Sequence, residues 1–178
     1  MDANGCLTVE TALRLLRLLP NDLDFILEAP CATWRKTLSL RERCHVPIML
    51  DELIEHDDVV VKTIALDAAD SIGLKVSKAG GLTHCRRQRD ICSAAGLTMS
   101  VQDTVGSAIA FAGIVHLGQT IPSHLLKCIL DVRDMVTVET ADFEASIVDG
   151  GIKAPDLPGL GLKVKPEILG KPLANWTA

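Results

Sequence analysis

The sequence predicts an α/β fold in which parallel strands alternate with helices, as in part of a (β/α) TIM-type barrel. Short β-rich runs alternate with helical patterns, and the ends of these runs recur at a nearly constant interval. The expected strand ends are Asp2, Glu28, Asp51, Lys75, Asp103 and Asp131, separated by 26, 23, 24, 28 and 28 residues. Such spacing requires a parallel sheet with right-handed crossovers. The regular repeat, without a glycine-rich phosphate loop, favours a barrel over a doubly wound sheet.

The individual elements follow from local patterns. Strands are expected over Phe25–Glu28, Pro47–Asp51, Ile72–Val76, Leu97–Val101 and Leu125–Asp131, with a further strand ending at Asp2. Helices are expected between Thr8 as N-cap and Pro20, and over Thr33–Cys44, Asp58–Ala69 with Asp58 as cap, Leu82–Ala95 closed by Gly96, and Val105–Gln119. Beyond Asp134 the pattern weakens, and residues 154–161 are expected to form an ordered tail or loop.

Length and composition limit the classes of protein. A chain of 178 residues predicts one domain, and 48% hydrophobic with 23% charged residues indicates a globular chain. A net charge of −5 and only 3% aromatic residues argue against a nucleic-acid surface. No apolar run approaches the roughly 18 to 20 residues of a membrane span, and the N-terminus has no leader pattern. We therefore expect a soluble, cytoplasmic protein that binds neither membrane nor nucleic acid.

The cysteines and histidines carry no recognisable site. The six cysteines form no CxxC pair and are expected to be reduced and mostly buried. The five histidines likewise lack the spacing of metal ligands.

Three acidic strand ends predict a metal site. Side chains at the carboxyl ends of barrel strands converge on one mouth, where Asp2, Glu28 and Asp51 would face one another. Taken singly, each could be a helix cap or a loop residue. Together, three buried like charges are unfavourable unless a cation lies among them, and oxygen ligands without His or Cys favour Mg²⁺, with Mn²⁺ as a substitute.

Lys75 ends the next expected strand and would point at the same mouth. Burial and a nearby divalent cation could lower its pKa enough for proton transfer. The alternative is a lysine that only neutralises the carboxylates. Lys78 would lie on the opposite face if the strand continued that far, and is the weaker candidate, suited to packing or to supporting the loop.

These residues resemble the barrel domain of the enolase superfamily, in its mandelate racemase and muconate-lactonizing enzyme branch. The resemblance covers nearly the whole chain, so residues 1–178 would form the C-terminal part of such a barrel. The matching segments are Asp2–Gly5, Leu27–Cys31, Pro47–Glu52, Leu74–Gly81 and Pro158–Gly161. The resemblance implies that Asp2, Glu28 and Asp51 hold Mg²⁺ and that Lys75 is an acid/base lysine acting on an ene-diolate intermediate.

Within this branch, residues 28–31, 77–87 and 100–107 are most similar to the cis-3-hydroxy-L-proline dehydratases. The implied reaction of hydroxyproline breakdown removes the α-proton, expels the 3-hydroxyl and yields a pyrroline-2-carboxylate. Asp103 and Asp131 would lie near the cationic ring nitrogen of this amino-acid substrate, and Thr104 and Cys31 would border it. Helix capping or a structural ion pair is the alternative for the two aspartates.

The sequence also departs from the branch. The Lys-x-Lys pair that the branch carries on an earlier strand has no counterpart here, and the first two strands and the N-terminal capping domain are expected to be absent. Two alternatives therefore stay open: a 2-epimerase or racemase of hydroxyproline betaine or a related cyclic amino acid, and an inactive fragment that could aggregate. The resemblance implies a homo-oligomer for the intact protein.

Overall fold

A five-stranded parallel sheet forms the centre of the molecule, in a computed structural model that describes residues 1–103, 106–131 and 133–176. The strand order follows the chain order, as in one continuous arc of a barrel. The strands are β1 (Leu27–Glu28), β2 (Ile48–Leu50), β3 (Ser71–Lys75), β4 (Thr98–Gln102) and β5 (Leu126–Ile129). All five predicted strands are therefore present, each shifted by no more than three residues at either end.

The start of the chain lies against the β1 edge of this sheet. Asp2 forms an isolated parallel bridge with Glu28, and the Glu28 N–H donates to the Met1 carbonyl at 2.8 Å. Asp2 thus pairs with the sheet as predicted, but through a single bridge and not as the end of a strand.

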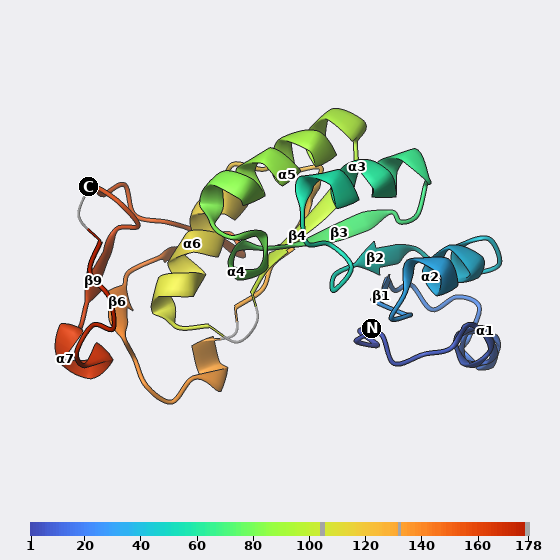
Figure 1. Cartoon of the computed structure of the whole chain (residues 1–178), viewed down its shortest axis with the longest axis horizontal. Helices are drawn as coiled ribbons and strands as arrows, with labels where there is room; N and C mark the ends of the chain where they lie inside the picture. The colour runs from blue at the N-terminus through green and yellow to red at the C-terminus, as the bar shows by residue number, and fades with distance from the viewer. Residues whose placement is uncertain (104–105, 132, 177–178) are drawn as a thin grey trace.

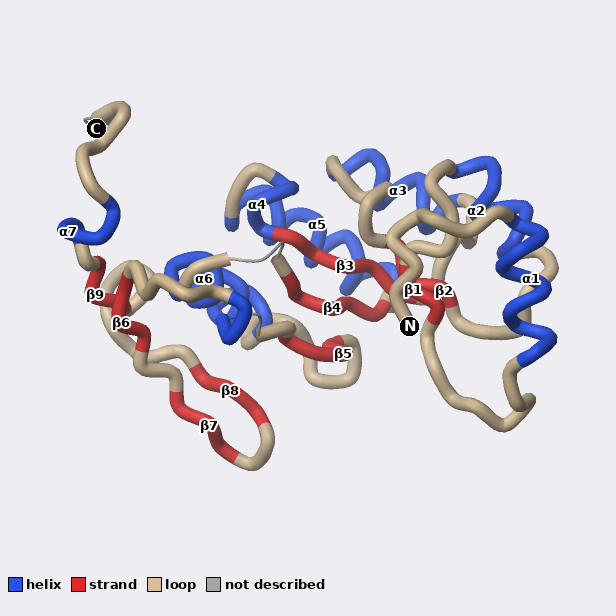
Figure 2. The backbone as a smooth tube through the Cα atoms, turned by 90° about the horizontal axis from the view of Figure 1, so that it is seen from below, coloured by secondary structure: helices blue, strands red, loops and turns tan. Residues whose placement is uncertain are grey.

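Helices connect the strands, and α3, α4 and α5 lie on the same side of β3 and β4 (Figures 1 and 2). The helical segments are α1 (Val9–Leu18), α2 (Trp34–Arg41), α3 (Asp57–Ala65), α4 (Val76–Ala79), α5 (Leu82–Ala95), α6 (Ala108–Gly118), the short 3₁₀ turn η1 (Arg133–Met135) and α7 (Pro166–Leu169). Each of the strands β1 to β4 is followed by a helix before the next strand begins, as in the βα repeat of a barrel. The partial TIM-type barrel is confirmed.

The core is packed between the sheet and these helices. On β1 to β4, residues that face the helices are almost completely buried: Leu27, Ile48, Leu50, Ile72, Leu74, Met99 and Val101. They pack with helical residues such as Val60, Cys85 and Ile114. Burial of each large aliphatic side chain contributes about 1.5–3 kcal/mol. Because side chains alternate along a strand, the intervening positions, among them Gly73 and Gln102, face the opposite side of the sheet.

Several predicted helix boundaries are confirmed by their caps. The Thr8 hydroxyl accepts from the Thr11 N–H at the start of α1, and Gly96 closes α5 with φ of 71°. The prediction for α3 was wrong at both ends. The helix begins at Asp57 with His56 as N-cap, and it ends at Ala65 because Asp67 adopts φ of 45°, outside the helical region.

Residues 154–161 contain no helix or strand, as expected for a loop, but the chain beyond Asp134 also forms short strands that were not predicted. Two antiparallel pairs form there, one between β6 (Ala141–Phe143) and β9 (Leu162–Val164), the other between β7 (Ser146–Val148) and β8 (Gly151–Lys153). Asp149 and Gly150 join β7 to β8 and both have positive φ, as in the tight hairpin turns that Asp-Gly favours. This Asp-Gly pair between two short apolar runs was the signal that the sequence analysis overlooked.

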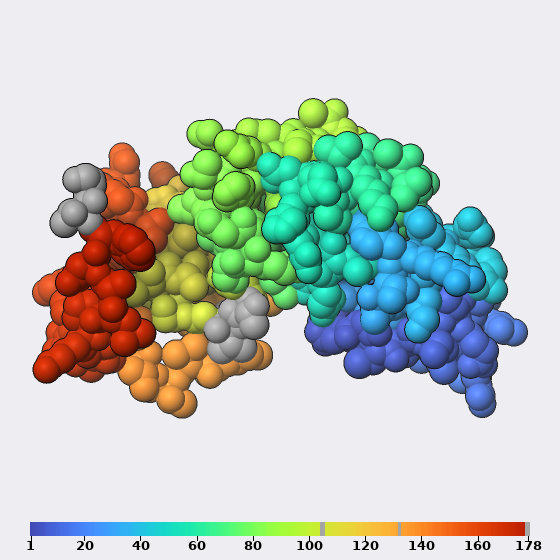
Figure 3. Space-filling model, viewed as in Figure 1, coloured from blue at the N-terminus to red at the C-terminus, as the bar shows by residue number. Residues whose placement is uncertain are grey.

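The molecule is elongated and arched, with the N-terminal helices at one end and the β6–β9 pair at the other (Figure 3). None of the helices in the described ranges is long and apolar enough to cross a bilayer.

Candidate active site

The predicted site residues gather at the carboxyl edge of the sheet. Glu28 ends β1, Asp51 directly follows β2, Lys75 ends β3 and Asp103 directly follows β4. Parallel pairing of successive strands brings these ends to one side of the molecule. The regular spacing of these residues in the sequence therefore correctly predicted that they lie at one edge of the sheet.

Asp51 is the centre of the charged contacts at this edge. Its side chain is only 2% exposed. Lys75 Nζ donates to Asp51 Oδ2 at 2.5 Å, and Lys78 Nζ donates to Asp51 Oδ1 at 2.9 Å as well as to the Asp51 carbonyl. A buried carboxylate without partners would be strongly destabilising, and here each of its oxygens accepts from an ammonium group.

Lys78 lies on the same side as Lys75, contrary to the expectation of an opposite face. Strand β3 ends at Lys75, and the helical turn α4 begins at Val76. In a helical turn, residues three apart lie above one another, so Lys78 returns to the side from which Lys75 points. The two-residue alternation of a strand was therefore the wrong rule for this pair.

Glu28 lies beside the same cluster. Burial is the main cause that raises the pKa of Glu28; the charges of Asp2 and Asp51 raise it further, while a hydrogen bond from Gln102 and the charge of Lys75 lower it. Gln102 Nε2 donates to Glu28 Oε1 at 3.0 Å. The three predicted metal ligands thus lie within electrostatic range of one another, with Lys75 among them.

The carboxylates do not close around one point in this structure. Within residues 1–103, 106–131 and 133–176, no three His, Cys, Asp or Glu side chains form a group that could hold a metal ion. We expected the side chains of Asp2, Glu28 and Asp51 to surround one metal position. In this structure they do not, because Lys75 and Lys78 bind the two oxygens of Asp51. The set still fits Mg²⁺ chemically: it consists of carboxylate oxygens, and the mutual effect of these charges on Glu28 is one that a cation would relieve.

Asp103 connects the end of β4 to the lysine-bearing turn. The Ser77 hydroxyl donates to Asp103 Oδ1, so α4 is tied to the end of β4 by a residue that lies between Lys75 and Lys78 in the sequence. Asp103 is buried at the same edge. Its predicted neighbour, Thr104, lies outside the described residues.

Asp131 lies two residues beyond β5 and forms a local ion pair. Arg133 donates from Nε at 2.9 Å and from Nη2 at 2.7 Å to the two Asp131 oxygens, and these hydrogen bonds lower the pKa of Asp131. The Arg133 guanidinium also lies 4.0 Å from the centre of the Phe111 ring. The structural ion pair left open for Asp131 is therefore present, and contact of Asp131 with a substrate stays a prediction.

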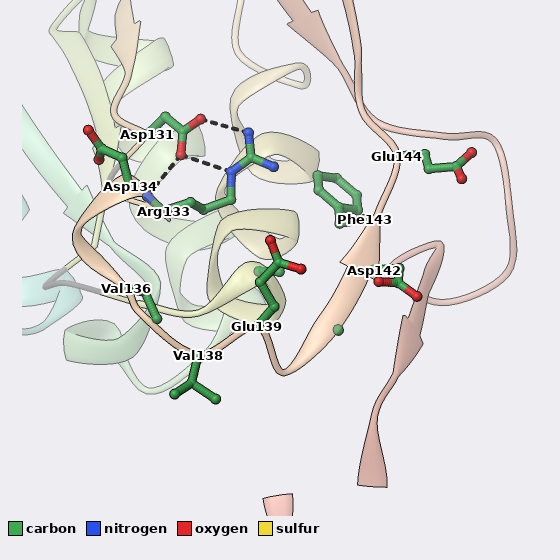
Figure 4. Close-up of a pocket in the computed structure, with 11 residues that line it drawn as sticks. Asp131, Arg133, Asp134, Val136, Val138, Glu139, Asp142, Phe143 and Glu144 are labelled. Carbon is green, nitrogen blue, oxygen red and sulfur yellow. Dashed lines mark hydrogen bonds and ion pairs between the residues drawn. The ribbon is translucent and has the colours of Figure 1, made fainter. Parts of the chain in front are cut away.

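Asp131 and Arg133 line a pocket of about 630 Å³ between the loop after β5 and strand β6 (Figure 4). Its other polar lining is acidic, with Asp134, Glu139, Asp142 and Glu144. None of the residues around Asp51 lines it, so this cavity is separate from the lysine and carboxylate cluster.

Cys31 follows β1 and is buried, in an antiparallel bridge with Cys6. Burial raises the pKa of the Cys31 thiol. Such a thiol is a packing residue in this structure, and its predicted place at the border of the substrate stays a prediction.

Gln102 and Ser77 are site residues that the sequence analysis did not single out for a role. Both lie within the segments that carry the family resemblance. Gln102 also occupies the last position of β4, directly after the core-facing Val101, so the alternation of the strand would have placed its side chain on the face opposite the core.

Comparisons with known proteins identify a family and several relatives. The family described as "Enolase C-terminal domain-like" matches residues 1–168. Among curated proteins, the cis-3-hydroxy-L-proline dehydratase of Roseibium aggregatum is 38% identical over 176 residues, covering 99% of this chain and 48% of that protein. The o-succinylbenzoate synthase of Thermobifida fusca is 32% identical over 143 residues, covering 80% of this chain and 44% of that protein.

Solved structures give the same result. A protein from Aspergillus oryzae, assigned to the mandelate racemase/muconate lactonizing enzymes, is 61% identical, with a TM-score of 0.93 over 97% of this chain and 48% of that chain. A similarly assigned protein from Roseovarius nubinhibens, complexed with magnesium, is 56% identical, with a TM-score of 0.93 over 97% of this chain and 47% of that chain. The present chain spans about half the length of these relatives.

Proposed function

Because the chain belongs to the enolase C-terminal domain-like family, we propose that the intact protein is a Mg²⁺-dependent lyase that dehydrates cis-3-hydroxy-L-proline. The single observation that carries the chemistry is the Asp51 carboxylate held between Lys75 and Lys78 at the edge where Glu28 also lies. The similarity to a curated dehydratase over 99% of the chain supports the substrate.

In this proposal Asp2, Glu28 and Asp51 hold Mg²⁺, and the magnesium-bound relative at 56% identity supports this assignment. When bound, the cation would stabilise the negative charge that develops on the substrate carboxylate as the α-proton leaves. The chain's own carboxylates would fix its position at the end of the sheet.

A lysine of the Asp51 pair would carry the protons. The neutral amine accepts the α-proton, and an ammonium donates a proton to the 3-hydroxyl, which leaves as water when the C3–O bond breaks. The electron pair of the broken C–H bond forms the new C2–C3 double bond, and the resulting enamine tautomerises to a pyrroline-2-carboxylate. We assign the acid/base role to Lys75, with Asp103 and Asp131, and Thr104 and Cys31, as substrate contacts.

A second candidate is a racemase or 2-epimerase of a cyclic amino acid. It would use the same carboxylates and lysine but return a proton to the α-carbon. Relatives named N-succinylamino acid racemase and D-Ala-D/L-Ala epimerase, 29% and 28% identical, favour this candidate.

Proton NMR in D₂O separates these functions. The 178-residue chain is incubated with Mg²⁺ and cis-3-hydroxy-L-proline, and Asp51→Asn is the negative control. Loss of the C3 hydroxyl supports the dehydratase, whereas exchange of the α-proton without that loss supports the epimerase. Absence of both contradicts catalysis by this chain and supports the inactive fragment.

Two charge-conserving variants identify the acid/base lysine. Arginine keeps the positive charge beside Asp51 but does not release its proton at neutral pH. We expect Lys75→Arg to slow α-proton exchange by about 10²- to 10⁴-fold, the usual contribution of a positioned general base. Lys78→Arg is the matched control and should cost far less. The reverse order of effects would transfer the role to Lys78.

A further inference from the structure

We propose that Gln102 is a positioning residue that orients Glu28 for Mg²⁺, a role that rests on the proposed function. Gln102 comes from β4, whereas Glu28 comes from β1 at the opposite end of the four-strand order β1-β2-β3-β4. The Gln102 amide nevertheless reaches Glu28 Oε1, with Nε2 at 3.0 Å. The two side chains therefore meet although two strands lie between β1 and β4 in the sheet, and the amide holds one oxygen of a predicted metal ligand.

Gly73 provides the space for this contact. It lies in β3, and a Cβ atom built at Gly73 would lie only 2.1 Å from Gln102 Nε2 and 3.2 Å from Gln102 Cδ. No real side chain could occupy that position with the amide in place. The absence of a side chain at Gly73 therefore leaves the space that the Gln102 amide occupies.

The chemistry of glutamine suits this role. Gln102 is only 6% exposed, so its amide has lost water and gains the Glu28 oxygen as partner. An amide donates a hydrogen bond without adding positive charge, and so it fixes the carboxylate without competing with a cation as Lys75 and Lys78 do at Asp51. Groups that orient metal ligands in this way commonly change metal affinity 10- to 100-fold when they are removed.

Calorimetric titration of the 178-residue chain with Mg²⁺ tests the role. Gln102→Met keeps the length of the side chain but removes its donor, and we expect the Mg²⁺ dissociation constant to rise at least about tenfold. Gln88→Met is the matched control. Gln88 is also buried, at 2% exposure, but its Nε2 has no hydrogen-bond partner within the described chain, and we expect no change in Mg²⁺ affinity.

Gly73→Ala provides a second, independent variant. The added methyl group should displace the Gln102 amide and weaken Mg²⁺ binding as much as Gln102→Met does. Because both changes break the same contact, the double variant should be no weaker than either single variant. Gly113→Ala is the control, since a Cβ there meets only Leu82 at 4.0 Å.

The outcomes separate this role from the proposed function. If the unsubstituted chain does not bind Mg²⁺, the proposed metal site fails, and the role of Gln102 fails with it. If the unsubstituted chain binds Mg²⁺ and both Gln102→Met and Gly73→Ala bind it equally well, only the positioning role is overturned. Additive effects in the double variant would likewise overturn it, because the two residues would then act separately.

Discussion

At the scale of single residues, the buried carboxylate of Asp51 decides what the site can do. Its two oxygens accept from Lys75 and Lys78, so a charge that would be costly alone is compensated. The same arrangement means that any cation must share Asp51 with two ammonium groups. A change at Asp51 should therefore affect both the stability of this edge of the sheet and the affinity of the site for a metal ion.

Replacement of Asp51 tests this coupling. Asp51→Asn should weaken Mg²⁺ binding by more than about tenfold, because even the loss of an outer partner of a metal ligand has that effect. It should also lower the free energy of unfolding in urea by about 2 kcal/mol, since two partly buried lysines lose their partner. Glu52→Gln, at the exposed neighbouring position, is the control and should change neither. Unchanged Mg²⁺ affinity in Asp51→Asn would remove Asp51 from the metal site.

The thiols differ in reactivity because they differ in burial. Burial is the main cause that raises the pKa of Cys85 and of Cys92 to about 12, so both are protonated near pH 8. Cys6 and Cys128 are exposed. We expect a thiol reagent such as DTNB to modify Cys6 and Cys128 rapidly in the native chain and to reach Cys85 and Cys92 only in urea. Rapid native modification of Cys85 would contradict the packing of α5.

At the scale of elements, Asp70 holds α2 and the sheet together at the amino end of the strands, directly before β3 begins. Arg41 Nη2 donates to Asp70 Oδ1 at 2.9 Å, and the Ile48 N–H donates to Asp70 Oδ2 at 2.9 Å. Burial alone would raise the pKa of Asp70, but the hydrogen bonds from Arg41 and Ile48 and the Arg41 charge together lower it. One side chain thus joins helix α2 to strands β2 and β3.

The lowered pKa of Asp70 predicts a pH dependence. Below about pH 4 the unfolded chain binds a proton at this position more readily than the native chain, so this stabilisation is present above that pH and is lost as the pH falls. Asp70→Asn should lower the unfolding free energy by about 1 kcal/mol at pH 7 and reduce its loss on acidification. Asp67→Asn is the control, because the Asp67 side chain is 88% exposed and lies 3.5 Å from Arg41. An equal effect of both variants would contradict the role of Asp70.

At the scale of the whole molecule, the sheet is an open arc. Among the described strands, β5 pairs with β4 alone, and the β1 edge is covered only by the bridge at Asp2. A parallel sheet with open edges offers unpaired backbone groups to other chains. Large apolar side chains are also exposed, including Leu130 just beyond β5.

We therefore expect the chain to self-associate through this edge. Sedimentation velocity should give a mass above the 19.1 kDa of the monomer, increasing with concentration. Leu130→Lys should shift the distribution toward the monomer, because charged residues at a sheet edge oppose pairing. Glu167→Lys, an exposed change of charge in α7, is the control. A single 19.1 kDa species at every concentration would show that the edge is already protected.

The sequence by itself determined the repeat of strand and helix, and with it the edge where Glu28, Asp51, Lys75 and Asp103 meet. Periodicity and caps are local properties, and in a parallel sheet they also fix where strands end. Only the tertiary structure decided how side chains meet across strands. Lys78 joined Lys75 because β3 ends in a helical turn, and Gln102 reached Glu28 because Gly73 leaves room. Contacts between distant segments depend on packing, which no local pattern encodes.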